Sequence, residues 1–126
     1  MTDKARFAVW DYPGKGRGLR AMAPFAAGEL IAASPVLILP EAERLKVVET
    51  LIRHYYFVWE EAADGTWSAA LALGPVSLCN HTPTPNARFA LDHDRRCIDL
   101  FAARTIEAGE EITIDYDCDL WFEQGD

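Results

Sequence analysis

A chain of 126 residues is expected to form a single domain, and half of its residues are hydrophobic, enough for one core of ordinary size. Its formal net charge of -8 disfavours direct nucleic-acid binding, which needs a basic face, and favours cationic partners such as basic peptides. An acidic surface also has a plainer explanation, solubility, which charge alone favours.

The N-terminal third of the chain is predicted to form short strands separated by turns. A loop over residues 11–18 contains three glycines and a proline, a composition typical of turns. A second turn, Ala27-Gly28-Glu29, leads into an apolar strand, and residues 108–112 repeat this pattern. The strand candidates of this part are residues 7–10, 19–23, 30–32 and 36–39.

Pro40 begins the one clear helix of the sequence, since proline suits the first helical position. Acidic residues in its first turn and Arg53 and His54 in its last turn match the helix dipole. His54 is therefore interpreted as a C-terminal charge rather than a catalytic group. The apolar residues form one stripe at the spacing of an amphipathic helix: Leu45, Val48, Leu51, Ile52 and Tyr55.

Two hairpins and another strand are predicted after the helix. Asp64-Gly65 is a strong hairpin turn signal, and the charged residues 92–96 form the turn of the second hairpin. The expected strands are residues 56–59, 67–73, 88–91, 97–102 and 112–116. These elements predict a compact, mostly β domain with many short strands and one main helix.

Composition disfavours a role in membranes, secretion or metal binding. No segment approaches the roughly 20 apolar residues of a membrane span, so no membrane partner is expected. No apolar run follows the charged residues near the N-terminus, so no secretory signal is predicted. The odd number of cysteines, three, and the absent signal argue against a disulfide framework. The absence of a Cys-x-x-Cys pair argues against a structural zinc site. A cytoplasmic location is expected, with a secreted effector or a viral protein as alternatives.

Three short motifs carry the candidate chemistry, and each has a plain structural explanation by itself. The glycine loop Gly14-Lys15-Gly16-Arg17-Gly18 lets the backbone approach a ligand, although a simple β-turn also explains it. Asn80-His81, followed by two prolines and Asn86, is a polar segment between apolar runs, where buried polar groups need partners. Tyr116 follows Gly109-Glu110-Glu111, and core packing is its plain explanation.

In this order the three motifs resemble those of the SET domain family of protein lysine methyltransferases. The matching segments are Gly14 to Ala21, Asn80 to Asn86 and Gly109 to Tyr116, and the resemblance extends over residues 7–121. It looks closest to the minimal bacterial and viral members. The resemblance implies small curved β-sheets, a β-clip, with a C-terminal pseudoknot. It also implies one SET domain over residues 1–126, without the cysteine-rich zinc segments of larger members and hence without a metal.

The resemblance implies methyl transfer from S-adenosyl-L-methionine to lysine side chains of a protein, in a basic segment. Tyr116 would be the catalytic tyrosine beside the transferred methyl group, and Glu111 and Tyr116 match the family's Glu-x-x-x-x-Tyr spacing. The residues implied at the cofactor are Lys15, Gly16, Arg17, Gly18, Asn80, His81 and Trp121. Those implied in the substrate channel are Tyr56, Ile114 and Phe122. Further aromatic candidates for its lining are Tyr55, Trp59 and Trp121, for each of which core packing is an equal alternative.

Further expectations concern the product and the partners. Ile114 is smaller than the Phe or Tyr often found at this position, so di- or trimethylation is predicted to be sterically allowed. The acidic residues from Asp115 onward suit a basic peptide, and with the resemblance this is favoured over mere solubility. Trp121 and Phe122, or a second subunit in a homodimer, would complete the lysine channel. The alternatives are a catalytically inactive SET-fold peptide-binding module and an unrelated small β domain.

Overall fold

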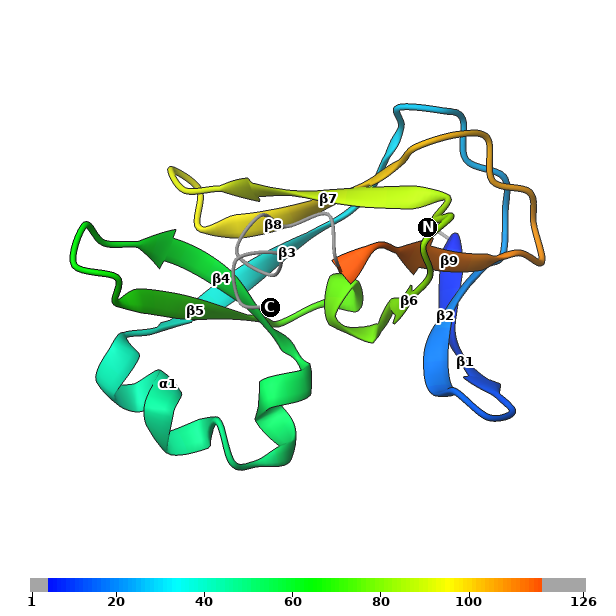
Figure 1. Cartoon of the computed structure of the whole chain (residues 1–126). Coiled ribbons are helices and arrows are strands. Elements are labelled where there is room, and N and C mark those ends of the chain that lie inside the picture. Colours follow the sequence, from blue (N-terminus) through cyan, green and yellow to red (C-terminus); the bar gives the residue numbers. More distant parts are fainter. Residues whose placement is uncertain (1–4, 117–126) are drawn as a thin grey trace.

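The computed structural model describes residues 5–116, and this part of the chain is built on two β-sheets (Figure 1). The four-stranded sheet has the order β1 (Phe7–Tyr12), β2 (Gly16–Ala21), β9 (Glu111–Ile114) and β6 (Asn80–His81). The five-stranded sheet has the order β4 (Tyr56–Glu61), β5 (Trp67–Ala72), β3 (Leu30–Leu39), β8 (Cys97–Ala102) and β7 (Ala87–Asp92). The helical elements are α1 (Glu41–Val47) and two 3-10 helices, η1 (Leu51–His54) and η2 (Pro75–Leu78). The predicted mostly β fold is confirmed.

The four-stranded sheet brings the three sequence motifs together. The β1–β2 hairpin turns at Gly14 and Gly16, whose φ angles of 82° and 84° favour glycine. Strand β9 runs antiparallel to β2 on one side and parallel to β6 on the other. In the parallel pair Asn80 lies opposite Thr113 and His81 lies opposite Ile114. The Asn-His segment and the segment that leads to Tyr116 are therefore neighbours in space.

The five-stranded sheet curls so that side chains of its two edge strands, β4 and β7, come into contact. The long strand β3 is central and pairs with β5 and β8. The ring centroids of Phe57 on β4 and Phe89 on β7 are 5.0 Å apart, and His93 Nε2 lies 2.8 Å from the Trp59 carbonyl oxygen. Side chains thus close the gap between the two edges. Both predicted hairpins, β4–β5 and β7–β8, are confirmed.

The core takes residues from both sheets and from η2, and alternate residues of β8 and β9 are among its most buried members. Ile98, Leu100 and Ala102 are fully buried, as the alternation of residues 97–102 predicts for one face of the strand. Ile112 and Ile114 are also fully buried. Burial of each such aliphatic side chain stabilises the fold by about 1.5–3 kcal/mol. This core fixes β9, and with it the position of Tyr116.

The predicted helix is wrong in its extent and in the face that it buries. The structure forms α1 and η1 in place of one helix, because Thr50 Oγ1 donates to the Val47 carbonyl and accepts from the Ile52 N–H. The apolar stripe is largely exposed, with Leu51 at 71% and Leu45 at 53% of their accessible surface.

Arg44 takes the buried position on α1. Its guanidinium carbon lies 3.6 Å from the centre of the Trp67 ring, and it bonds Glu41 Oε1 and the Trp67 carbonyl oxygen. The guanidinium of Arg44 stacks on the ring and forms hydrogen bonds to Glu41 and to the Trp67 carbonyl oxygen. These contacts offset the cost of burying the charge. A count of hydrophobic residues at helical spacing does not register this arrangement.

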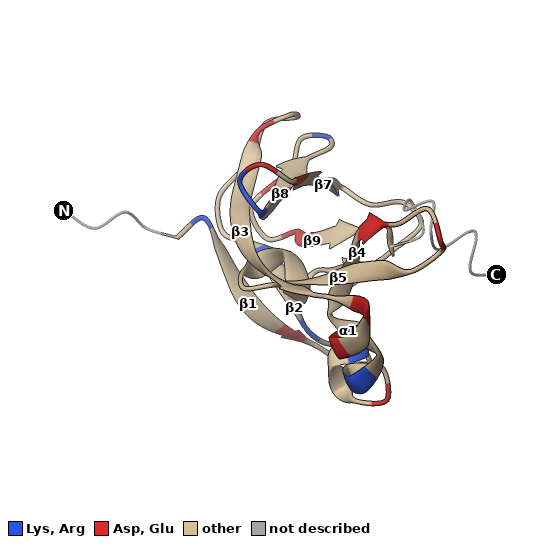
Figure 2. Ribbon diagram, turned by 90° about the vertical axis from the view of Figure 1, so that its left-hand side faces the viewer, with Lys and Arg blue, Asp and Glu red and all other residues tan. Residues whose placement is uncertain are grey.

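Charge is spread over the described residues rather than confined to one face. Acidic residues lie on α1, at the end of β4 and at the start of β9, with basic residues interspersed among them (Figure 2). None of the helices in residues 5–116 is long and apolar enough to span a membrane.

Candidate active site

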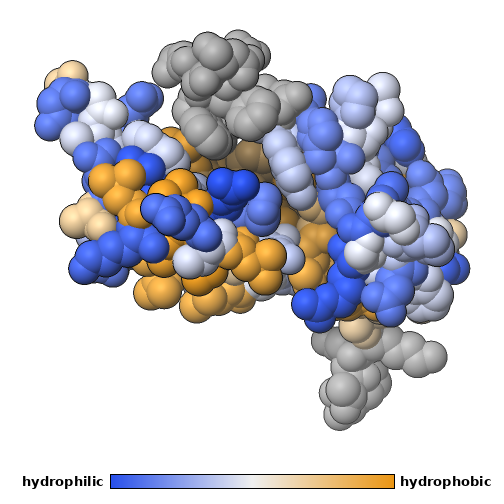
Figure 3. All heavy atoms as spheres, turned by 60° about the horizontal axis from the view of Figure 1, so that its bottom comes forward, coloured by the Kyte–Doolittle hydropathy of each residue, from blue (hydrophilic) through white to orange (hydrophobic). Residues whose placement is uncertain are grey.

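A cavity of about 290 Å³ lies where the β1–β2 turn, η1, η2 and β6 meet. It is bordered on one side by the apolar surface of α1 and η1 and on the other by the polar β1–β2 hairpin (Figure 3). The cavity is lined by Lys15, Gly16, Arg17, His54, Tyr55, Ser77, Leu78, Cys79, Asn80 and Tyr116. All three sequence motifs contribute to it, together with His54 and Tyr55 at the end of η1.

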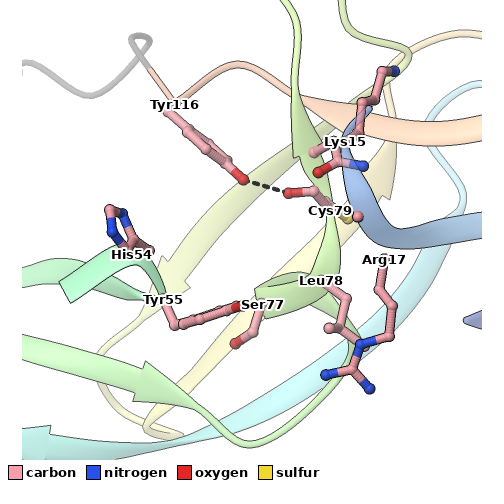
Figure 4. A pocket seen from close by; sticks show the side chains of 10 residues that line it. Lys15, Arg17, His54, Tyr55, Ser77, Leu78, Cys79 and Tyr116 are labelled. Carbon is pink, nitrogen blue, oxygen red and sulfur yellow. Dashed lines mark hydrogen bonds between the residues drawn. The ribbon is translucent and has the colours of Figure 1, made fainter. Parts of the chain in front are cut away.

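Tyr116 is held at both ends by the segment around Asn80. Its hydroxyl donates a 2.5 Å hydrogen bond to the Cys79 carbonyl oxygen (Figure 4), and its backbone N–H donates to His81 Nδ1 at 2.9 Å. Burial raises the pKa of the Tyr116 hydroxyl above its usual value, with nearby groups that can carry negative charge adding to the effect. The hydroxyl is therefore protonated at neutral pH and donates its hydrogen bond to Cys79 O, which leaves its oxygen lone pairs as acceptors for another group.

Glu111 organises the opposite side of the site. Its carboxylate accepts a hydrogen bond from Asn80 Nδ2 at 2.7 Å and forms a 2.8 Å ion pair with Lys15 Nζ. A β-carbon on Gly18 would lie 2.6 Å from Asn80 Nδ2 and 2.8 Å from Glu111 Oε2. Gly18 thus packs closely against this pair. Glu111 was not among the predicted site residues, although its spacing to Tyr116 was the signal that could have assigned it.

Asn86 fixes the other edge of the Asn-His segment to β9. Its side chain is buried, donates to the Glu111 carbonyl oxygen at 2.8 Å and accepts from the Thr113 N–H at 2.9 Å. The Thr82 N–H adds a bond to the Ile114 carbonyl oxygen. The polar residues between apolar runs are therefore satisfied by β9, which supports the expectation that this segment is not a plain surface loop.

The predicted cofactor residues are only partly brought together. Lys15, Gly16, Arg17 and Asn80 line the cavity together with Tyr116. His81 does not line it, and its ring packs with a centroid 5.1 Å from that of Tyr116. Gly18 does not line it either and packs against Asn80 and Glu111.

Two of the predicted substrate-channel residues, Tyr56 and Ile114, do not line the cavity. Tyr56 packs against Trp67, with ring centroids 5.9 Å apart, and the neighbouring Tyr55 lines the cavity in its place. Ile114 is fully buried in the core and is not part of the cavity lining. A one-residue difference decides which tyrosine faces the cavity, and the pattern of residues 55–59 alone does not settle it. Trp121 and Phe122 lie outside the described residues.

Two further residues, His54 and Cys79, line the cavity although the sequence did not assign them to a site. His54 ends η1, as its interpretation as a C-terminal residue requires, yet it also lines the cavity. Cys79 is 1% exposed, and burial raises the pKa of its thiol to about 12, so it is an unreactive thiol at neutral pH. Residues 5–116 contain no group of three or more His, Cys, Asp or Glu side chains that could hold a metal ion.

The arrangement of these motifs matches a known family. Residues 16–117 match the model of the SET domain. The chain belongs to the SET domain family. This SET domain is 36% identical over 116 residues to a Schizosaccharomyces pombe histone-lysine N-methyltransferase specific for H3 lysine 37, a match that covers 91% of this chain and 76% of that protein. It is 34% identical over 114 residues to a Yarrowia lipolytica enzyme specific for H3 lysine 36, covering 85% of this chain and 15% of that protein.

Solved structures confirm the predicted SET-type fold. A Plasmodium falciparum candidate histone methyltransferase superimposes with a TM-score of 0.71 at 19% identity, over 94% of this chain and 99% of that chain. The Neurospora SET domain protein DIM-5, a histone lysine methyltransferase, superimposes with a TM-score of 0.68 at 21% identity, over 87% of this chain and 51% of that chain. The sequence relatives are fungal histone methyltransferases, so the predicted likeness to bacterial and viral members is not confirmed. Protein lysine methyl transfer is the enzyme class of this SET domain.

Proposed function

We propose that this SET domain transfers a methyl group from S-adenosyl-L-methionine to the side-chain amine of a lysine in a basic protein. The observation that carries the proposal is the Tyr116 hydroxyl, fixed to the Cys79 carbonyl at a cavity that the glycine loop also lines. Methyl transfer needs donor and acceptor held in line, and fixed groups of this kind supply that orientation.

The residues present fit S-adenosyl-L-methionine. Gly16 has open space around the position of a β-carbon and a φ of 84°, so its backbone is accessible at the cavity. Asn80 uses its side-chain nitrogen on Glu111, which leaves the amide oxygen as an acceptor for a ligand. When bound, the cofactor supplies a methyl group on a positively charged sulfur. The backbone of residues 16–17 and the Asn80 amide would hold it.

Tyr116 would orient the lysine amine rather than deprotonate it. A free lysine has a pKa of about 10.4 and must lose a proton before it can attack. Because the raised pKa of Tyr116 keeps its hydroxyl protonated, the tyrosine is not a general base at neutral pH. Desolvation and a neighbouring positive charge both lower the pKa of the lysine, so its proton can leave to water. The Tyr116 oxygen then accepts an N–H of the amine and fixes the direction of its lone pair.

The aromatic side of the cavity suits a cationic side chain. Tyr55 and Tyr116 both line the cavity, and aromatic rings attract ammonium groups, including methylated ones, through their faces. We place the lysine on this side, where Tyr55 and not Tyr56 lines the cavity. The roles of Trp121 at the cofactor and of Phe122 in the channel stay predictions, as does the effect of Ile114 on the number of methyl groups.

Histone H3 is the first substrate to test, because the fungal relatives are named for lysines of that protein. The net charge of -8 would attract a lysine-rich tail over long range, an effect that weakens with salt. A cytoplasmic basic protein is the other candidate, in line with the location expected from the sequence.

A transfer assay tests the proposal. The protein is incubated with methyl-labelled S-adenosyl-L-methionine and histone H3, and separately with a cell lysate, and labelled lysine is identified by mass spectrometry. Tyr116→Phe should lower turnover on the order of a hundredfold, because it removes the orienting oxygen, while cofactor affinity by calorimetry stays nearly unchanged. Absence of labelled lysine from both substrates would contradict the proposal. Peptide binding without any transfer would instead identify the inactive binding module.

A further inference from the structure

Among residues 5–116, strand β1 has a paired neighbour on one side only. The four-stranded sheet ends at β1, which pairs with β2 and lies on the outer side of the sheet (Figure 1). The bond from the Met22 N–H to the Arg6 carbonyl oxygen fixes which backbone groups of β1 face β2. Because bonding alternates along an antiparallel pair, the N–H and C=O groups of Phe7, Val9 and Asp11 point away from β2. They form a row of donors and acceptors with which another strand can pair.

Strand β1 lacks the features that usually prevent pairing at the edge of a sheet. Its sequence contains no proline and no lysine, and its register with β2 is unbroken over the whole strand. Asp11 is its only charged residue, and Arg17 lies opposite Asp11 on β2. Natural proteins protect free edges with prolines, lysines or bulges, so an unprotected strand of six residues indicates an edge that pairs.

The side chains of β1 leave apolar surface open at the same edge. Val9 lies opposite the buried Leu19, on the face of the sheet from which Phe7 packs against the core, yet 49% of Val9 is exposed. On the other face the Trp10 ring, stacked against the Arg20 guanidinium, is 40% exposed. A further strand would cover both side chains, and removing such apolar area from water is favourable.

We infer that a second copy of this chain pairs with β1 in antiparallel orientation, about a twofold axis at Val9. In this register Val9 of one copy faces Val9 of the other, so that the two side chains cover each other. The large Trp10 of each copy lies beside the small Ala8 of the other. The outward backbone groups of Phe7 meet those of Asp11 in the other copy, so every outward group of the strand gains a partner.

A second copy fits this edge better than a flexible peptide does. Strand β1 is already formed in each copy, so pairing costs little of the chain entropy that a disordered peptide loses on binding. The strand also carries one acidic residue, not the acidic row that would select a basic tail. Because the two strands run in opposite directions, the β1–β2 turns lie at opposite ends of the joined edge, and the cavities that they line stay apart.

Analytical ultracentrifugation of the full chain tests the interface with opposite charges at Val9. Two paired strands of six residues bury less than the roughly 1,200 Å² of a stable interface, so the wild type is expected to dimerise at micromolar concentrations. Val9→Lys or Val9→Glu alone should weaken self-association roughly tenfold, because like charges then face each other at the twofold axis. A mixture of the two variants should restore association, since opposite charges meet.

Two controls accompany these variants. Leu51→Lys changes an apolar residue of η1 that is 71% exposed, and it should leave association unchanged. Melting temperatures of the dilute Val9 variants should equal that of the dilute wild type, because Val9 is half exposed in the single chain. In the wild type itself, hydrogen exchange should show the amides of Phe7, Val9 and Asp11 gaining protection as the protein concentration rises.

Each other result overturns the inference. A wild type that stays monomeric at and above micromolar concentrations has no such interface. A mixture that associates no better than either Val9 variant alone would exclude the twofold axis at Val9. Association that is lost in Leu51→Lys and kept in Val9→Lys would place the interface on the apolar surface of α1 and η1. Protection of the β1 amides that appears only when a histone H3 peptide is added would assign this edge to the protein substrate.

Discussion

The close packing of Gly18 against the Asn80–Glu111 pair gives a sharp test of how the site is built. In Gly18→Ala the new methyl group would lie 2.6 Å from Asn80 Nδ2, 2.8 Å from Glu111 Oε2 and 3.0 Å from Tyr12 Cδ2. The first two atoms end flexible side chains, but they are bonded to each other, and Glu111 is also paired with Lys15. The methyl group can therefore be accommodated only if this network opens.

The cost of that opening follows from the bonds at risk. One charge-assisted hydrogen bond contributes about 1.5–3 kcal/mol, and strain from an added methyl group in a packed site costs about 1–3 kcal/mol. The two costs are alternatives, because opening the hydrogen bond relieves the strain. Since Asn80 and Glu111 are partly accessible, we expect a loss of about 2 kcal/mol. For a domain of this size such a loss lowers the melting temperature by about 4–8 °C.

A double-mutant cycle separates the predicted cause from general damage to the strand. Urea unfolding is measured for Gly18→Ala, Asn80→Ala and the double mutant. In the Asn80→Ala background the nearest obstructing atom is gone, so Gly18→Ala should cost at least 1 kcal/mol less there than in the wild type. Equal costs in the two backgrounds, or a melting temperature of Gly18→Ala within about 1 °C of wild type, would refute the reasoning.

Three other predictions concern a thiol, a hydroxyl and a buried cation. Iodoacetamide at pH 8 should modify Cys97 well before Cys79, since Cys79 is 1% exposed and has a pKa of about 12; equal rates by mass spectrometry would contradict this. Because the folded pKa of Tyr116 is raised, its contribution to stability is complete below the unfolded pKa of about 10 and is lost as pH rises through the folded value. An alkaline loss of stability below pH 9 that vanishes in Tyr116→Phe would argue against the burial of this hydroxyl. Arg44→Ala should destabilise the fold by about 2–3 kcal/mol through lost packing on Trp67, whereas Arg44→Met should cost less than half of that; the reverse order in thermal melts would show that charge dominates.

The sequence predicted most strands because alternation and turn chemistry are local. Ile98 and Leu100 face the core as their spacing requires, and Asp64-Gly65 forms the expected turn. It failed on the helix because the fit between Arg44 and Trp67 depends on a contact between elements distant in sequence. The order of the three motifs was enough to predict that Lys15, Asn80 and Tyr116 belong to one site, and the three residues line one cavity.

What the motifs could not supply was side-chain direction. Tyr55 and Tyr56 are adjacent and chemically alike, and the end of η1 decides which of them faces the cavity. The sequence likewise did not predict that Tyr116 bonds the backbone oxygen of Cys79 and the ring of His81. Every residue has a backbone oxygen, so residue types do not indicate which of these groups form a bond. Ile114 shows the same limit. It lies on the predicted strand, but its side chain is fully buried in the core and does not line the cavity.

The position of β9 between β2 and β6 has a consequence for the order of folding. Strand β9 pairs with residues near both Leu19 and Asn80, and Asn86 closes the segment around it. The position of β9 between β2 and β6 forms only after those distant segments have come together. Closing long loops costs chain entropy before native contacts compensate for it, so this step is slow. Since β9 carries Glu111 and leads to Tyr116, a partly folded chain has no assembled site. Methyl transfer should therefore return during refolding only in the slowest phase, together with the last native structure.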